Sequence, residues 1–206
     1  MGRATRGRPE GSEREPFDPS RLPSPSLDST DLRMSYRIAR GEQGVLTFEP
    51  YKSILLPHWR FKTVAIATQS SQTLWEAFQH YVKAGDFVGA DMARKFIQMG
   101  MTRAKRYANH KGGKKYDRSA SQIEKEGGKR VELAKSEDHK GREEKLEASN
   151  VFKEVWRRCT SDEKYLELKQ EFLSEQKAWD KNPKKLKKEE PSDGEDAVKM
   201  ENEDEV

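Results

Sequence analysis

The residues best suited to chemistry form a run of eight cations with no acid between residues 94 and 116, beginning with Arg94 and Lys95. Such cations neutralise phosphates and release counterions, which gives an affinity that falls as salt rises. In a helix, Arg103, Arg106 and His110 share one face, and the Gly112-Gly113 pair can bring backbone amides to a phosphate. We therefore predict a polyanion-binding site at a helix end and the following loop. Its expected residues are Arg103, Lys105, Arg106, Asn109, His110, Lys111, Gly112, Gly113, Lys114 and Lys115.

The same run has a purely structural interpretation. Lysines are favoured near helix C-termini by the macrodipole, and glycine is a common helix C-cap. Nevertheless, the formal net charge is only +4 while residues 189–206 hold nine acids and one lysine, so the positive excess lies elsewhere, largely in this run. We expect the acidic segment to compete with anions for the basic run.

A second block, residues 49–61, interleaves aromatic side chains with cations and prolines. Aromatic rings beside cations can stack on nucleobases, but aromatic residues beside prolines are also ordinary core. His58 with Glu42 or Glu49 can act as a general acid or base, because imidazole titrates near neutrality. The alternative function is therefore a small enzyme acting on an anionic substrate. Its site would contain Glu49, Lys52, His58, Trp59 and Arg60.

Motifs of familiar catalytic and metal sites are missing from the sequence. The four histidines and Cys159 do not show C-x-x-C or H-x-x-x-H spacing, so we expect no metal site. Neither a phosphate-binding G-x-x-x-x-G-K-[ST] loop nor a G-x-S-x-G nucleophile motif occurs. We expect no cofactor and assign no catalytic residue.

Helices are the elements that must position these side chains. Leu74, Phe78, Tyr81 and Val82 predict a helix from about Ser70 to Gly85. A second helix is predicted from Asp86 to Gly112, a third through 151–159, and a fourth from a Thr160 capping box to about Lys181. A short strand is expected at 45–48. The predicted fold class is mostly α with a small β element (α+β).

Composition divides the chain into a folded part and tails. Only 33% of the residues are hydrophobic and the mean hydropathy is -1.09. We predict a disordered leader at 1–35, one compact α-rich domain at 36–181 interrupted by a charged mobile insertion at 117–147, and a disordered tail at 182–206. No apolar run suits a membrane span or a secretory signal. We expect an intracellular protein, cytoplasmic or nuclear, in which PKKLKK at 183–188 is a possible import signal.

Three stretches carry a resemblance to a known family. RGEQGVLTFEPYKSILLPHWRFKT, DFVGADMARKFIQMGMTRAKRYANHKGGKKYD and SNVFKEVWRRCTSDEKYLELKQ together resemble an uncharacterised family of small soluble microbial proteins, catalogued as a domain of unknown function. The resemblance implies a shared core but no activity, cofactor or site residue. From the residues themselves we expect a noncatalytic module that binds nucleic acid, DNA or RNA, or another polyanion. The alternatives are the small enzyme and a protein–protein scaffold.

Overall fold

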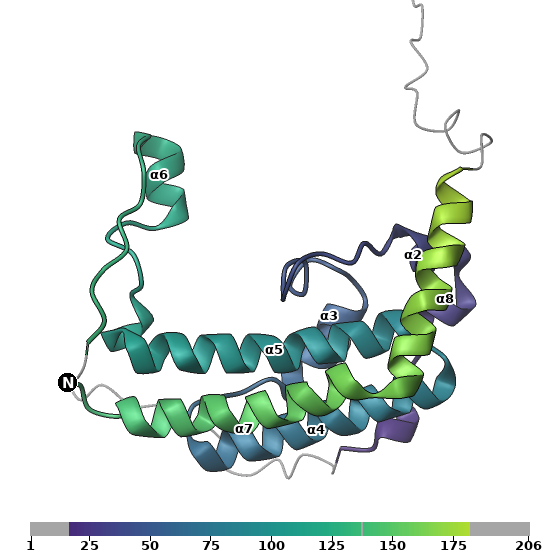
Figure 1. Cartoon of the computed structure of the whole chain (residues 1–206), viewed down its shortest axis with the longest axis horizontal. Coiled ribbons are helices and arrows are strands. Elements are labelled where there is room, and N and C mark those ends of the chain that lie inside the picture. Colours follow the sequence, from purple (N-terminus) through teal and green to yellow (C-terminus); the bar gives the residue numbers. More distant parts are fainter. Residues whose placement is uncertain (1–16, 137, 182–206) are drawn as a thin grey trace, which may run out of the picture.

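Three long helices lie side by side and form the body of the protein (Figure 1). They are α4 (Val64–Ala84), α5 (Phe87–Asn109) and α7 (Arg142–Ser161). The structure is a computed structural model that describes residues 17–136 and 138–181. Each helix buries one apolar stripe, and the three stripes meet in a common core. The predicted mostly helical domain is confirmed.

A tight turn makes α4 and α5 antiparallel neighbours. Gly85 caps α4 in a left-handed conformation with φ of 78°, which glycine adopts without steric cost. The side chain of Asp86 then accepts a hydrogen bond from the Gly89 amide at 2.9 Å, as expected for the N-cap of α5. α4 begins at Val64, earlier than predicted, because the hydroxyl of Thr63 caps the Ile66 amide.

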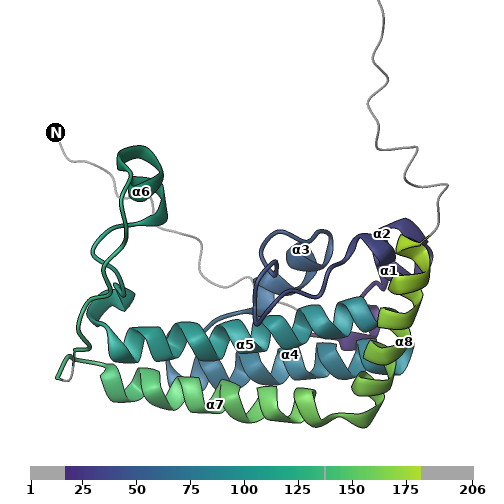
Figure 2. The same ribbon diagram turned by 45° about the horizontal axis from the view of Figure 1, so that its top comes forward.

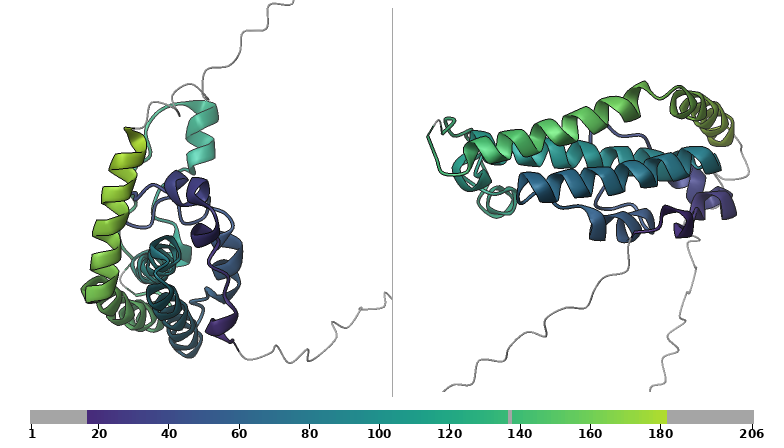
Figure 3. Two further views of the ribbon diagram at one scale, coloured as in Figure 1. Left: turned by 90° about the vertical axis from the view of Figure 1, so that its right-hand side faces the viewer. Right: turned by 90° about the horizontal axis from the view of Figure 1, so that it is seen from below.

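The last helix, α8 (Glu163–Asp180), turns away from α7 and crosses the end of the bundle (Figures 2 and 3). Its N-cap is Asp162, whose side chain accepts from the Tyr165 amide at 2.8 Å. Phe172 of α8 stacks on Phe87 at the start of α5, with 4.7 Å between ring centroids. α8 thus closes one end of the core.

The segment before α4 packs along the bundle in short turns. It contains η1 (Pro19–Arg21), α1 (Pro25–Asp28), α2 (Thr30–Ser35), α3 (Tyr51–Leu55) and η2 (Leu56–His58). Ser26 donates a 2.6 Å hydrogen bond to the buried carboxylate of Asp86, and Met34 lies in the core. Residues 17–35, which we expected in the disordered leader, therefore pack on the domain.

The predicted β element is absent from residues 17–136 and 138–181, which contain no strand. The residues expected as a strand lie instead in successive turns. Gly41 and Gly44 have φ values of 65° and 82°, and the Thr47 amide donates to the Gly44 carbonyl at 3.1 Å. Two left-handed glycines bend the backbone too sharply for an extended segment, and the prediction of a small β element was wrong.

Between α5 and α7 the chain forms an arm, residues 114–136, that stands away from the bundle (Figure 1). It follows η3 (Lys111–Gly113) and carries α6 (Ala120–Glu126). A single antiparallel bridge joins Tyr116 to Glu132 at its base. α7 begins at Arg142, within the segment expected as an insertion. PKKLKK and the acidic segment lie outside the described residues, and none of the described helices is long and apolar enough to cross a bilayer.

Candidate functional site

The C-terminal half of α5 and the returning segment of the arm line a hollow of about 520 Å³. It is rich in cations and includes six of the ten residues predicted to bind polyanions. Its lining residues are Glu42, Thr102, Arg103, Lys105, Arg106, Asn109, His110, Lys115, Glu132 and Lys135. The structure thus brings much of the predicted site together.

A second hollow of about 390 Å³ adjoins the first, because Arg106 and Lys115 line both. Its lining residues are Arg106, Lys114, Lys115, Tyr116, Asp117, Arg118, Ser119, Gln122 and Arg130. We call the two hollows together the basic surface. Arg118, Arg130 and Lys135 come from the arm and were missed by sequence reasoning, which treated 117–147 as a mobile insertion. The sequence feature that could have indicated them is that cations continue to occur beyond Lys115.

Eight cationic and three acidic side chains line the basic surface, an excess of five positive charges. The three acids already have partners. Glu132 lies 3.4 Å from Lys115, Asp117 lies 3.6 Å from Arg118, and Glu42 accepts a 2.7 Å hydrogen bond from Thr102. These pairs are partly exposed and therefore weak, so an anion can compete for the same lysine and arginine.

His110 is the least exposed polar residue of the basic surface, with 4% of its area accessible. Its Nδ1 is buried and has no hydrogen-bond partner among the described residues. A buried imidazole nitrogen without a partner is uncommon in folded proteins. Arg106 lies beside it and is fixed by donating from Nε to the Gly113 carbonyl at 2.8 Å.

The two glycines and Lys111 do not line the basic surface. Gly112 and Gly113 have φ of 66° and 70°, and a Cβ on Gly113 would lie 2.7 Å from the Tyr107 ring. Their role is to turn the chain tightly against α5. Lys111 is exposed, and its backbone amide donates to Ser136 at 3.2 Å.

Arg94 and Lys95, which open the predicted cationic run, are buried. Arg94 Nε donates to Asp91 at 2.7 Å, and Lys95 Nζ lies 3.6 Å from the same carboxylate. Burial opposes the charges, but attraction to Arg94 outweighs it and holds the pKa of Asp91 below its ordinary value. Including these two cations in the exposed run was an error of the sequence analysis.

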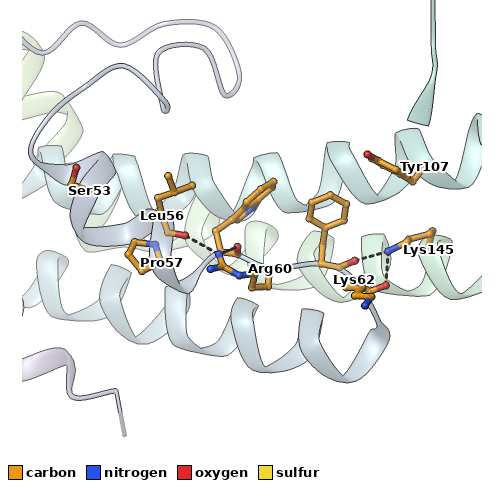
Figure 4. Close-up of a pocket in the computed structure, with 9 residues that line it drawn as sticks. Ser53, Leu56, Pro57, Arg60, Lys62, Tyr107 and Lys145 are labelled. Carbon is orange, nitrogen blue, oxygen red and sulfur yellow. Dashed lines mark hydrogen bonds between the residues drawn. The ribbon is translucent and has the colours of Figure 1, made fainter. Parts of the chain in front are cut away.

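On another side of α5, an aromatic groove of about 1000 Å³ runs along the segment before α4 (Figure 4). The ring centroids of Trp59 and Phe61 are 5.0 Å apart, and those of Phe61 and Tyr107 are 5.7 Å apart. Three cations and no acid line it. The residues of the groove are Ser53, Leu56, Pro57, Trp59, Arg60, Phe61, Lys62, Tyr107 and Lys145.

Lys145 of α7 holds the backbone of one groove wall against the bundle through hydrogen bonds. Its Nζ donates to the Phe61 carbonyl at 2.9 Å and to the Lys62 carbonyl, as the dashed lines in Figure 4 show. Partial burial lowers the pKa of Lys145. The backbone that carries Trp59 and Phe61 is therefore held in place. The two rings pack against each other and also line the groove, and the stacking of nucleobases on them stays a prediction.

The residues of the enzyme alternative are not gathered at one place. Glu49 pairs with Lys52 and accepts a 3.0 Å hydrogen bond from Ser53, interactions that lower the pKa of Glu49. The His58 ring meets Phe17, with centroids 4.6 Å apart. Of the predicted set, only Trp59 and Arg60 line the aromatic groove. Neither Glu49 nor His58, the proposed acid–base pair, lines that groove.

Comparison with known proteins identifies the domain. The family model of the domain of unknown function DUF4385 matches residues 20–175. The chain belongs to this family. No curated protein and no solved structure matches the chain. The match confirms the resemblance to a domain of unknown function, and the DUF4385 region includes both the arm and residues 20–35, which sequence reasoning had placed outside the domain core.

Metal ligation has no evident place in the described part of this DUF4385 chain. Residues 17–136 and 138–181 contain no cluster of three His, Cys, Asp or Glu side chains placed to hold an ion. Cys159 is buried on the inner face of α7, and burial raises the pKa of its thiol. Since only the thiolate is strongly nucleophilic, Cys159 is a core residue.

Proposed function

We propose that this DUF4385 domain is a noncatalytic module that binds nucleic acid through its basic surface. The observation that carries the proposal is the convergence of eight cations and only three acids on two adjoining hollows. Arginine and lysine side chains there would contact backbone phosphates, which requires no base-specific hydrogen bonds. An intracellular location, cytoplasmic or nuclear, is part of the same proposal.

The aromatic groove favours single strands over duplex. Tyr107 lines the groove, while its neighbour Arg106 lines the basic surface, so the same end of α5 serves both. Tyr107 is 37% exposed and therefore open to contact. Unpaired bases can stack on Trp59, Phe61 or Tyr107 while cations hold the backbone, whereas the bases of a duplex are already stacked.

A salt titration tests the proposal. Labelled single-stranded RNA, single-stranded DNA and duplex DNA of equal length are titrated with the full chain at several salt concentrations. If five phosphates are neutralised, the logarithm of the affinity for a single strand falls against the logarithm of salt with a slope of about -3.5. Affinity that is unmeasurable at low salt, or independent of salt, contradicts the proposal, and a duplex preference contradicts the role of the groove.

Charge reversal locates the binding surface. Lys114→Glu with Lys115→Glu should weaken binding at low salt by at least about ten-fold and reduce the salt slope for a single strand by about 1.4, because two phosphate contacts are lost. The control reverses two exposed lysines at the opposite end of the bundle, Lys83→Glu with Lys177→Glu, with the same change in net charge. Equal losses in both double variants would mean that overall charge, and not this surface, attracts the nucleic acid.

The scaffold alternative has a smaller basis. Leu166 and Leu173, seven residues apart on α8, are 40% and 46% exposed. Two exposed leucines are within the normal range for a protein surface. The enzyme alternative retains its own test, since His58→Ala should abolish any turnover without affecting binding to single strands.

A further inference from the structure

A separate cavity of about 310 Å³ lies where α5, α7, α8 and the loop at 38–41 meet. We call it the interhelical cavity. Its walls combine apolar side chains with cations and amide or indole groups, and the nucleic-acid proposal uses none of them. They are Ile38, Ala39, Gly41, Asp91, Arg94, Gln98, Trp156, Thr160, Tyr165, Leu166 and Lys169.

The cluster of charges beside this cavity is not neutral. Asp91 is the carboxylate shared by two buried cations, Arg94 and Lys95. The hydroxyls of Tyr36 and Tyr165 also donate to Asp91, the latter at 2.7 Å, so its oxygens are fully engaged. Lys95 Nζ also donates to the Gln43 carbonyl at 3.2 Å and lies over the Tyr36 ring, and it does not line the cavity. Arg94 does line the cavity, so its guanidinium is the buried cation that an anion there can meet.

Two walls of the interhelical cavity add groups that suit an anion. Lys169 of α8 supplies a further positive charge. The indole Nε1 of Trp156 is buried and has no hydrogen-bond partner among the described residues. Gln98 accepts from Arg94 through its Oε1 at 2.8 Å, which leaves its amide nitrogen as a donor.

We propose that the interhelical cavity binds a small organic carboxylate. The carboxylate would lie against Arg94 and Lys169 and accept from Trp156, while its apolar body would contact Ile38 and Leu166. The volume is at the lower end for small-molecule sites, which limits the ligand to a compact molecule. The apolar walls favour an organic carboxylate over inorganic phosphate, which has no apolar body to place against them.

The proposal is tested with acetate, butyrate and benzoate as probes, with inorganic phosphate and chloride at matched ionic strength. The thermal midpoint and calorimetric titration of the full chain are measured. We expect saturable binding and a rising midpoint for butyrate or benzoate. A cavity that holds only water gives no such response. Absence of carboxylate binding, or binding of phosphate in preference, overturns the proposal.

Variants place the ligand in the cavity. Trp156→Phe keeps an aromatic ring but removes the indole donor, and Lys169→Ala removes a charge. Each should weaken carboxylate binding by about ten-fold, as expected for one hydrogen bond to a charged group. The matched controls are Trp75→Phe and Lys177→Ala, which lie outside the cavity. Unchanged affinity in both test variants contradicts the site. The site is independent of the nucleic-acid proposal, because Lys169→Ala should leave the salt slope for single strands unchanged.

Discussion

Asp91 shows how one residue organises several elements. Its carboxylate accepts from Tyr36 in the segment before α3, from Tyr165 in α8 and from Arg94 one turn along α5. The tyrosine hydroxyls remain protonated, because burial, reinforced by the charge of Asp91, raises the pKa of each. Asp91 therefore joins three parts of the chain as a hydrogen-bond acceptor, and replacing it should weaken the packing of all three.

We predict that Asp91→Asn lowers the free energy of unfolding by about 3–5 kcal/mol, because it leaves Arg94 and Lys95 buried without their counter-charge. Denaturant unfolding at neutral pH measures the change. The control is Asp180→Asn, which removes an exposed pair with Arg37 and should cost less than about 1 kcal/mol. Similar small losses in both variants would show that the Asp91 cluster contributes little to stability.

Comparing wild type with Asp91→Asn also gives a prediction for the effect of pH on stability. The pKa of Asp91 is lowered from its ordinary value of 3.8, so its stabilising contribution is complete above that value and is lost as the pH falls through the lower folded value. The difference in unfolding free energy between wild type and Asp91→Asn should therefore stay constant from about pH 7 to pH 5 and shrink in stronger acid. A difference that grows on acidification would contradict the assignment.

At this scale, sequence reasoning identified the residue types but not their surroundings. Asp91, Arg94 and Lys95 stand at i, i+3 and i+4, the spacing that places three side chains on one helix face. The cationic run was counted from Arg94, so the acid that pairs with its first two members was left out. The cavity beside Trp156 depends on α8, whose crossing direction no local pattern specifies.

At the scale of elements, α5 and α7 approach closely because Gly100 faces Phe152. A Cβ at Gly100 would lie 2.5 Å from the fully buried Phe152 ring, a distance that requires one helix or the ring to move. Gly100→Ala should therefore lower the free energy of unfolding by about 1–3 kcal/mol, although alanine is the better helix former. Thermal and denaturant unfolding check this value.

A double-mutant cycle separates crowding from helix propensity. Phe152→Leu removes the ring that the new methyl group would strike, so Gly100→Ala should be neutral or stabilising in that background. The same loss in both backgrounds would show that the close approach is not the cause.

The stripes of α4, α5, α7 and α8 were predictable because apolar spacing is local. The turns that replace the expected strand at 45–48 were not predictable, because they depend on the left-handed conformations of Gly41 and Gly44.

At the scale of the whole molecule, the arm and the bundle have different roles. The buried core of the described residues includes Ala104 in α5 and Ala148 in α7 but no residue of the arm. The arm nevertheless supplies Arg118, Arg130 and Lys135 to the basic surface. The sequence predicted that this segment was charged and was not core. Its cations were not assigned to the site, because a segment expected to be mobile has no predictable place.

We therefore predict that the arm can be shortened without unfolding the bundle. The Asp117 amide donates to the Val131 carbonyl at 3.1 Å, so two glycines in place of residues 118–130 can close a hairpin there. The shortened chain should keep its thermal midpoint within a few degrees, about the effect of 1 kcal/mol, since no core contact is lost. Its affinity for single-stranded RNA should fall and its salt slope should decrease by about 1.4, because Arg118 and Arg130 are gone. Arg118→Gln with Arg130→Gln in the full chain is the matched control and should reproduce both changes. If the shortened chain binds less well while this double variant binds like wild type, the arm acts through its backbone or α6, and its two arginines are not phosphate contacts.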